Sequence, residues 1–264
     1  MNILYVGDVM GEVGIRVVEQ ILPNLRSDKQ IDLVIAQAEN VSEGKGMTTA
    51  DYRRLRAAGV DGFSGGNHTM NRPELAPLLS DPASPVIGPA NMPDCPGPGY
   101  KYVGAGDKQV LMVSLLGQIV GKDADKPVSN PLLTIDEILA RESDNARCIV
   151  VNFHGDFSSE KVVIGHYLDG RVTAVVGDHW HVPTADARVL PAGTAHITDV
   201  GMCGVLNSSL GVEYDSIIPR WKTGRPTKNL LADEPPFQFN ALLVEVGDQG
   251  LAAAVEHLQI MLQG

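Results

Sequence analysis

Short apolar runs rich in β-forming residues recur along the whole chain, and they constrain its fold more than any other feature. They cover residues 2–6, 31–38, 60–65, 109–117, 147–153, 172–177, 194–200 and 240–246. Several are apolar throughout, as strands buried on both faces are. Between the early runs, Ile15, Val18 and Leu22 share one helical face, and a second helical pattern ends at Gly59. Strands that alternate with helices predict an α/β layered fold.

Four other segments carry local signals. Thr134 and Glu137 have the spacing of a capping box, which predicts that a helix begins there. Another helix is expected over residues 158–168, before an Asp-Gly pair. Segment 85–100 is rich in Pro and Gly and is expected to be an ordered loop. Residues 251–262 favour a helix by the period of their apolar positions, although a terminal strand remains open.

The length of 264 residues fits one large domain, residues 1–264. Within it, segment 203–237 breaks the alternation and contains a basic cluster at 220–228, which predicts a small cap or a contact in a homo-oligomer. The formal net charge is −11 and there is no long basic run. Nucleic-acid polymers and anionic membranes are therefore not expected as partners, whereas a small anion can still be bound by local charge.

The first residues and the cysteines indicate the cellular compartment. The opening "MNILYV" lacks the basic region and cleavage site of a signal peptide, and no apolar run reaches the roughly 18 to 20 residues of a membrane span. We therefore interpret the protein as cytoplasmic. Cys95, Cys148 and Cys203 are odd in number and lack CxxC spacing, so neither a disulfide framework nor a thiolate zinc site is indicated. Any metal must use nitrogen and oxygen ligands.

The stretch "GDHWH", residues 177–181, follows an apolar run and contains two of the seven histidines. In an extended chain, side chains two residues apart point to the same side, so His179 and His181 could present their rings to one point. That geometry suits a metal. The alternative is that both rings are structural and bond to backbone groups.

Polar residues follow five of the apolar runs. They are Asp8, Glu39, Asn40, Asn67, His68, His154, His179 and His181. In layered α/β folds the carboxyl ends of the strands share one edge, where ligands bind, so these residues can converge. Each alone has a structural alternative, such as a helix cap at Asp8, a turn at Asn67 or a hydrogen-bonded core ring at His154. Together they are too many polar groups to bury at one edge without a ligand.

These motifs carry a resemblance to a known family. "GDVMG", "AEN", "GGNH", "NFH" and "GDHWH", in this order, resemble the calcineurin-like metallophosphoesterases and, within them, the YmdB-like family of 2′,3′-cyclic-nucleotide 2′-phosphodiesterases. The resemblance covers nearly the whole chain and extends to "GKGMT", "GPANMP" and "GTAHITDVGM". It implies a four-layer α/β/β/α sandwich of the metallophosphoesterase type, with two metal ions at the strand ends.

The resemblance also implies roles for the polar residues. The metal ligands would be Asp8, Asn40 and His181 for one ion, Asn67, His154 and His179 for the other, and Glu39 as the bridge. His68 would be free to act as the general acid. Two positions depart from the wider superfamily. The superfamily usually begins with an Asp-x-His motif, whereas this chain has Met10 in place of the histidine. A thioether is a soft metal ligand and fits poorly beside carboxylate ligands. Thr69 stands where an acid often follows the "GNH" motif, so the group that orients His68 is left open.

The chemistry of the reaction agrees with this set of residues. A phosphodiester is anionic, so its hydrolysis needs charge neutralisation, a nucleophile near pH 7 and a proton for the departing alkoxide. Two cations about 3.5 to 4 Å apart supply the first two, with a metal-bridging hydroxide as nucleophile, and His68 supplies the third. Imidazole, carboxylate and carboxamide ligands without a thiolate fit Fe, Mn, Zn or Co. The resemblance favours iron, with manganese as the alternative and zinc or cobalt after them.

We therefore expect a dinuclear metal-dependent phosphodiesterase that hydrolyses 2′,3′-cyclic nucleotides, with 3′,5′-cyclic nucleotides as further candidates. One alternative is a general phosphomonoesterase for small substrates. Another is a regulatory protein that binds a cyclic nucleotide and hydrolyses it slowly. A dinucleotide-binding loop at "GDVMGEVG" is disfavoured because its glycines lack GxGxxG spacing. Lys45, Asn91 and Arg171 are interpreted as loop residues and Trp180 as packing, outside the site.

Overall fold

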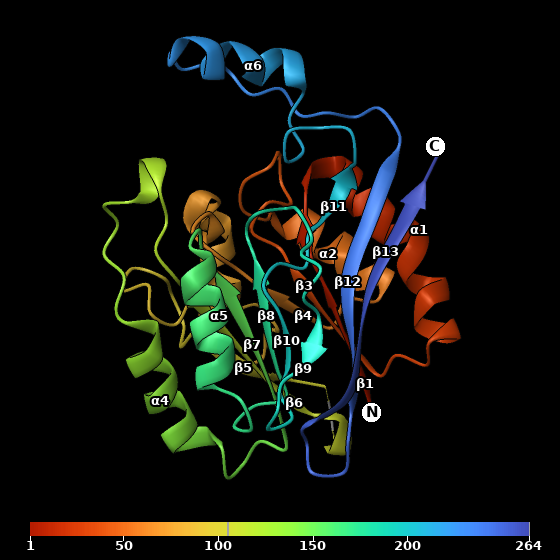
Figure 1. Cartoon of the computed structure of the whole chain (residues 1–264), viewed down its shortest axis with the longest axis vertical. Helices are drawn as coiled ribbons and strands as arrows, with labels where there is room; N and C mark the ends of the chain where they lie inside the picture. Colours follow the sequence, from red (N-terminus) through yellow and green to blue (C-terminus); the bar gives the residue numbers. More distant parts are fainter. Residues whose placement is uncertain (105, 264) are drawn as a thin grey trace.

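The computed structural model describes residues 1–104 and 106–263, so Gly264, the last residue of the predicted domain, lies outside the described residues. Two β-sheets form the centre of this part of the chain (Figure 1). In the first sheet the order is β2 (Asp8–Val9), β11 (Met202–Val205), β12 (Phe237–Val246), β1 (Asn2–Val6), β3 (Leu33–Gln37) and β4 (Gly62–Ser64), and β13 (Ala252–Leu262) pairs with β12. In the second the order is β5 (Tyr100–Val103), β6 (Val110–Leu116), β7 (Cys148–His154), β8 (Ala174–Asp178), β10 (Ala195–Ile197) and β9 (Arg188–Val189).

The helices lie outside the two sheets and in the connections. The α-helices are α1 (Gly11–Asp28), α2 (Thr49–Ala58), α3 (Ala76–Ser80), α4 (Pro131–Glu142), α5 (Ser158–Tyr167) and α6 (Tyr214–Thr223). The short 3₁₀ turns are η1 (Thr69–Asn71), η2 (Pro73–Leu75), η3 (Gly106–Lys108) and η4 (Gly121–Asp123). Within the described residues, no helix is both long and apolar enough to cross a membrane.

Three apolar cores separate four layers. Side chains alternate along β1, so Leu4 and Val6 pack toward α1 and α2 while Ile3 and Tyr5 pack in the core between the sheets. The third core lies between the second sheet and the helices α4 and α5, where Ile164 of α5 is fully buried. The predicted α/β/β/α sandwich is confirmed.

The strand predictions are largely confirmed. Each of the eight apolar runs contains a strand of one of the two sheets, with ends shifted by a few residues. Four strands of two to four residues, β2, β5, β9 and β11, were not predicted. Segment 85–100 is a loop up to Tyr100, where β5 begins, as expected.

The helix favoured by periodicity at residues 251–262 is wrong, and the terminal strand that was left open is confirmed as β13. It pairs antiparallel with β12 from Ala252 opposite Val246 to Leu262 opposite Phe237. Leu258, Ile260 and Leu262 pack in the core beneath α1, and their spacing of two residues is that of a strand. The apolar positions therefore fitted both periods, and pairing with a long neighbour decided between them.

The helix at residues 131–142 begins one turn earlier than predicted. The side chain of Asn130 accepts hydrogen bonds from the backbone N–H groups of Leu132 and Leu133, at 2.9 and 3.3 Å. Asn130 is therefore the N-cap, and Pro131 occupies the first helical position, where its missing N–H costs nothing. The capping box predicted at Thr134 is wrong because that residue lies inside the helix. The helix predicted over 158–168 is confirmed as α5.

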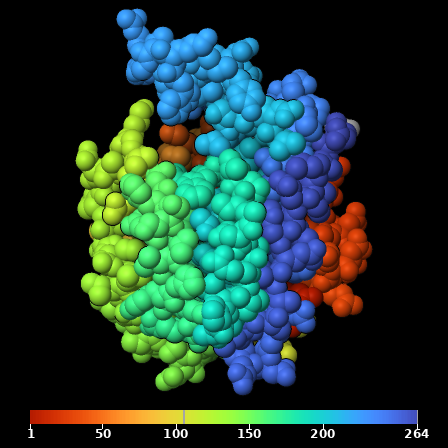
Figure 2. All heavy atoms as spheres, in the orientation of Figure 1, coloured from red at the N-terminus to blue at the C-terminus, as the bar shows by residue number. Residues whose placement is uncertain are grey.

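The parallel strands bring several chain segments to one edge of the sandwich. β1, β3 and β4 run parallel in the first sheet, as do β6, β7, β8 and β10 in the second. Their carboxyl ends lie in the upper part of Figure 1. Segment 203–237 starts with β11 and ends at the start of β12, while α6 between them stands away from the body (Figure 2). Trp221 of α6 is 81% exposed.

Candidate metal centre

The eight predicted site residues lie at the carboxyl edges of both sheets. Asp8 begins β2, Glu39 and Asn40 follow β3, and Asn67 and His68 follow β4. From the second sheet, the contributions are His154 at the end of β7 and His179 and His181 after β8. Apart from His68 and His179, which are partly exposed, these residues are buried. The structure therefore brings all eight residues into one cluster.

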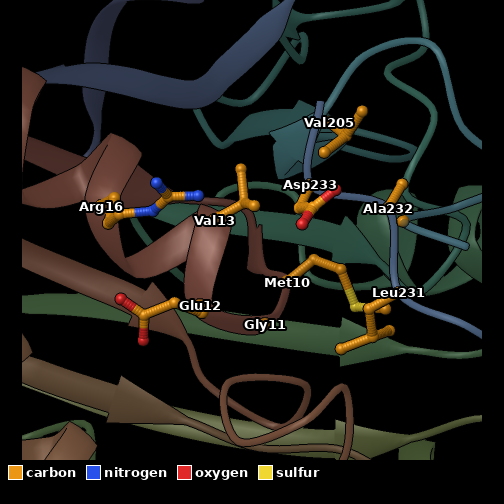
Figure 3. Close-up of a pocket in the computed structure, with 10 residues that line it drawn as sticks. Met10, Gly11, Glu12, Val13, Arg16, Val205, Leu231, Ala232 and Asp233 are labelled. Carbon is orange, nitrogen blue, oxygen red and sulfur yellow. The ribbon is translucent and has the colours of Figure 1, made fainter. Parts of the chain in front are cut away.

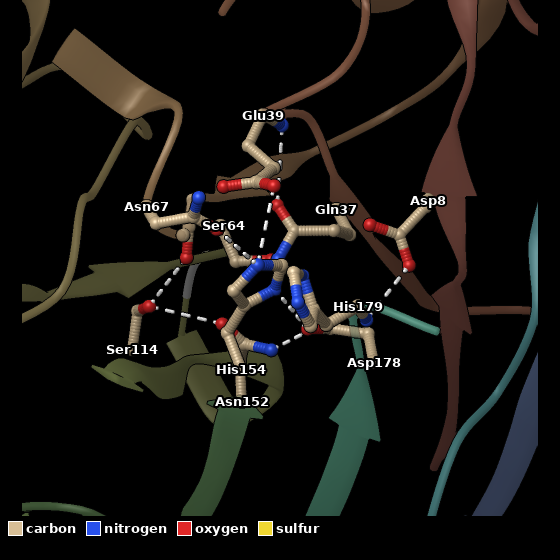
Figure 4. A network of polar contacts seen from close by, with 12 residues as sticks. Asp8, Gln37, Glu39, Ser64, Asn67, Ser114, Asn152, His154, Asp178 and His179 are labelled. Carbon is tan, nitrogen blue, oxygen red and sulfur yellow. Dashed lines mark hydrogen bonds and ion pairs between the residues drawn. The ribbon is translucent and has the colours of Figure 1, made fainter. Parts of the chain in front are cut away.

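Glu39 lies at the centre of the cluster. Its Oε1 atom is 3.1 Å from Nε2 of His154, and its Oε2 atom accepts a hydrogen bond of 2.8 Å from the backbone N–H of His68. One donor atom each from Glu39, His154 and His179 lie within 4.8 Å of one another, which is a suitable arrangement for a metal ion. Figure 4 shows these three side chains pointing toward each other.

On one side of Glu39 lie Asp8, Asn40 and His181, which we call the Asp8 half. The Oδ1 atom of Asp8 is 3.7 Å from Nε2 of His181 and 3.4 Å from Nδ2 of Asn40. Nδ2 of Asn40 is also 3.1 Å from Nε2 of His181 and 3.3 Å from Oε1 of Glu39. A carboxylate, an amide and an imidazole thus converge within a few ångströms.

On the other side lie Asn67, His154 and His179, which we call the His154 half. Oδ1 of Asn67 is 2.9 Å from Nε2 of His154, and the two histidine rings meet edge to face with their centroids 4.4 Å apart. The amide of Asn67 is oriented by Asp123 of η4, whose Oδ2 atom accepts a hydrogen bond of 2.7 Å from Nδ2. This bond leaves the Asn67 oxygen facing the cluster.

Burial governs the ionisation of the cluster. It raises the pKa of Asp8 well above its usual range, and it lowers the pKa of His179 to about 3 and that of His181 to about 4. Both of these rings are therefore neutral near pH 7, as metal ligation requires. Burial also opposes ionisation of Glu39, but the interaction with His154 outweighs it and holds the Glu39 pKa well below its usual range. Buried carboxylate, amide and imidazole donors of this kind fit first-row transition metals.

His68 stands at the edge of the cluster, with 22% of its side chain exposed. Its Nδ1 atom is 2.9 Å from Oδ1 of Asn40 and 3.3 Å from Oε1 of Glu39. The side chains of Asn40 and Glu39 therefore contact the ring at Nδ1, where the sequence left its partner open. Thr69, the residue in the place of the usual acid, uses its hydroxyl to close a turn by donating to the carbonyl of Gly66 at 2.8 Å.

Three acids behind the His154 half were missed by the sequence analysis. Oδ1 of Asp178 is 2.6 Å from Nδ1 of His154, and Oδ1 of Asp156 is 3.3 Å from Nε2 of His179. Asp123 supports Asn67. Since a ligating imidazole usually needs a partner on its second ring nitrogen, Asp178 could have been found within "GDHWH" itself. Asp123 gave no signal, because it lies 56 positions from its partner.

The backbone of the "GDHWH" stretch differs from the predicted extended chain. His179 and His181 have φ values of 98° and 62°, in the left-handed region that few non-glycine residues adopt. The two rings do not meet at one point, because His179 belongs to the His154 half and His181 to the Asp8 half. The indole Nε1 of Trp180 between them donates to the carbonyl of Asp156 at 3.1 Å, in keeping with the packing role expected for it.

Met10 lines a cavity of about 450 Å³ between α1 and residues 231–233. Figure 3 shows its thioether beside Leu231 on the wall of this cavity. The side chain that replaces the superfamily's usual histidine thus lines this cavity, together with apolar residues and with Glu12, Arg16 and Asp233. Of the loop residues set aside from the site, Asn91 is buried and donates to the carbonyls of Leu116 and Ser129, and Arg171 pairs with Asp136 of α4.

Comparisons with known proteins identify the family of the chain. The model of the family described as YmdB-like protein matches residues 4–258. A 2′,3′-cyclic-nucleotide 2′-phosphodiesterase of Bacillus subtilis is 37% identical over 250 residues, which are 94% of this chain and 92% of that protein.

Two crystal structures superpose over nearly the full length. One, of a hypothetical protein from Thermus thermophilus, has a TM-score of 0.90 at 39% identity and covers 99% of both chains. The other, of a novel phosphatase from Mycoplasma pneumoniae, has a TM-score of 0.91 at 29% identity and covers 100% of this chain and 94% of that one. The chain therefore belongs to the YmdB-like family, and it is a hydrolase.

Proposed function

We propose that the protein is a dinuclear metal-dependent phosphodiesterase that hydrolyses cyclic nucleotides, with 2′,3′-cyclic nucleotides as its main substrates. The observation that carries this proposal is the cluster centred on Glu39, whose carboxylate contacts Asn40 of the Asp8 half and His154 of the His154 half, with the partly exposed His68 beside them. The name of the B. subtilis relative supports the choice of substrate.

The Asp8 half would hold one metal, the His154 half would hold the other, and Glu39 would lie between them as a shared ligand. In the structure the oxygen of Asn40 faces His68, and its Nδ2 atom faces His181 at 3.1 Å. Because a metal binds the oxygen of an amide, ligation by Asn40 requires a half-turn of its amide group. Asn67 needs no such turn, since its oxygen already faces His154.

When bound, the metal ions neutralise the charge of the phosphodiester and make hydroxide available near neutral pH. The residues of the chain supply the rest. Nδ1 of His68 lies next to Asn40 and Glu39, which leaves Nε2, on the far side of the ring, to reach the substrate. As the bond between phosphorus and the ester oxygen breaks, Nε2 donates its proton to the departing alkoxide.

We further propose iron as the native metal, with manganese as the alternative, on the nitrogen and oxygen donor set and the family relationship. The test is metal analysis of the purified protein, paired with hydrolysis of 2′,3′- and 3′,5′-cyclic AMP before and after chelation. We expect about two metal ions per chain and loss of turnover on chelation that metal restores. Absence of both metal and chelator-sensitive turnover would refute the proposal.

A second candidate is a phosphomonoesterase for small substrates, which the similarity to the M. pneumoniae phosphatase favours. The same cluster can serve both reactions, since each transfers a phosphoryl group to water. A panel that compares kcat/KM for cyclic nucleotides with that for p-nitrophenyl phosphate separates the two. Faster hydrolysis of the monoester would assign the protein to this second class.

Segment 203–237 remains a candidate for a small cap or an oligomer contact. Tyr214, Ile218 and Trp221 of α6 are spaced along one side of the helix and are 50%, 41% and 81% exposed. We propose that this apolar side contacts a second copy of the chain. Sedimentation analysis of the protein and of a Trp221→Ser variant tests this, and a monomeric wild type at all concentrations would contradict it.

A further inference from the structure

The loop after β8 has an unusual backbone conformation and contributes residues to both halves of the cluster. His179 and His181 both have positive φ values, which side-chain-bearing residues adopt only where the surrounding structure imposes them. The same loop supplies one histidine to each half of the cluster. Residues outside the loop must therefore hold its backbone in this conformation. The contacts beneath the loop show which residues these are.

Lys161 of α5 lies directly beneath this loop and is fully buried. Its ammonium group donates to the carbonyl oxygen of Asp178 at 2.6 Å and to Oδ2 of Asp199 at 2.8 Å. The same nitrogen lies 4.0 Å from the centre of the Trp180 ring, a cation–π distance. One lysine thus contacts the residues on both sides of His179.

Asp199, which follows β10, completes the support. Its Oδ2 atom accepts a hydrogen bond of 2.9 Å from the backbone N–H of Trp180, and its Oδ1 atom accepts one of 3.0 Å from Gly201. Its own N–H donates to the hydroxyl of Thr184 at 2.9 Å. The pair of Lys161 and Asp199 therefore bonds the carbonyl just before His179 and the N–H just after it, which fixes both peptide groups that flank this residue.

Stability alone is a weak explanation for this ion pair. Burying two charges removes both from water, and apolar residues of similar volume often stabilise a protein at least as well. What an apolar pair cannot do is bond the two peptide groups around His179. The polar atoms of the pair are used on the loop itself, which points to a role in the site.

We propose that Lys161 and Asp199 are positioning residues for the metal centre, which fix the loop so that His179 and His181 each face their own half of the cluster. This inference rests on the proposed function for the assignment of the two histidines as ligands. It has a specific consequence. Because a single loop carries one ligand for each metal, loss of the pair weakens the binding of both metals together.

The test is the double variant Lys161→Met/Asp199→Asn, which removes both charges and keeps the approximate volume. Metal-free wild type and variant are titrated with Mn²⁺ in competition with a chelator, and folding is followed by circular dichroism. We expect the affinity of both sites to fall by about 10- to 100-fold, as is typical when support behind a ligand is lost. The single variant Asp199→Asn, which keeps an oxygen for the Trp180 N–H, is expected to show a smaller loss at both sites and provides the measurement if the double variant does not fold.

Lys101→Met is the matched control. Lys101 is also a buried lysine, and its ammonium donates to the carbonyls of Leu78 and Asp81, away from the metal centre. We expect this variant to lose stability and to bind Mn²⁺ as the wild type does. That contrast separates positioning from a general effect on folding.

Unchanged Mn²⁺ affinity at both sites in the folded double variant would overturn the inference and leave the proposed function intact. If the double variant does not fold, unchanged affinity in the folded Asp199→Asn variant would do the same. Weakening of one site alone would overturn it as well. A wild-type protein that binds no Mn²⁺ would instead overturn the proposed function, and the positioning role would fall with it. The titration of the wild type therefore distinguishes the two failures.

Discussion

The two halves of the cluster have similar donors but different support. In the His154 half, each member has an acid behind it, with Asp178 on His154, Asp156 on His179 and Asp123 on Asn67. In the Asp8 half, the second nitrogen of His181 instead contacts the backbone carbonyl of Leu210, at 3.2 Å. Since a carboxylate behind an imidazole orients the ring and increases its basicity, we expect that, in the proposed dinuclear centre, the metal of the His154 half is bound more tightly.

The largest expected effect removes the element that the two halves share. Glu39→Ala takes away the one carboxylate placed between them, so we expect the loss of both metals and of turnover. Metal analysis after purification and after reconstitution measures this effect. Full occupancy in the variant would show that the halves are independent and that Glu39 is not a bridge.

His68→Ala tests the residue that lies beside both halves without belonging to either. The expected fall in kcat is about 10²- to 10⁴-fold, the usual contribution of a general acid. Both metals are expected to stay bound, because His68 contributes no ligand in this proposal. Metal analysis and steady-state kinetics on one preparation give both values. A variant with full activity on a cyclic nucleotide would exclude His68 as the acid.

The variant Asp178→Asn removes one of the acids that support the His154 half and so tests the expected difference in metal affinity between the halves. We expect Mn²⁺ affinity to fall by about 10- to 100-fold in the His154 half, with the Asp8 half little changed. Asp61→Asn is the control, because Asp61 accepts a hydrogen bond from the backbone N–H of Val34 and pairs with Arg26 instead of a ligating histidine. Equal weakening of both sites by Asp178→Asn would mean that the acid supports the whole cluster rather than one half.

The smallest expected effect is the difference in metal affinity between the two halves of the wild-type protein. Stepwise addition of a chelator should release metal in two phases, with the first phase from the Asp8 half and affinities that differ by about tenfold, at the low end of such effects. The EPR signal of Mn²⁺, which changes when a coupled pair becomes a single ion, follows the release. A single phase would mean that the additional acids do not alter affinity.

Much of the fold could be predicted from the sequence because its signals are local. An apolar run of a few residues between loops identifies a central strand such as β6 or β7, whatever its neighbours are. The C-terminal segment could not be assigned in this way, since Leu258, Ile260 and Leu262 fit a strand only once β12 is known to lie beside them. Pairing between distant segments decided that element.

In the candidate site, too, the features with local signals could be predicted and those set by distant contacts could not. Its eight residues were predicted because each follows an apolar run, and the carboxyl ends of such strands share one edge. The residue types of His179 and His181 did not indicate their positive φ values, and the contacts of Lys161 and Asp199 with the peptide groups around His179 appear only in the folded chain. The acids behind the ligands, apart from Asp178, were also out of reach, since only the folded chain brings them near.

Each half of the cluster takes donors from both sheets, and the sheets are joined beneath it by the core that contains Tyr5. The hydroxyl of Tyr5 in the first sheet donates at 2.8 Å to Asp178 in the second, directly under His154. The thickness of this apolar layer therefore sets the separation of the ligands. A substitution deep in the layer, far from any donor atom, should therefore alter the distances between the donors of the two sheets within each half.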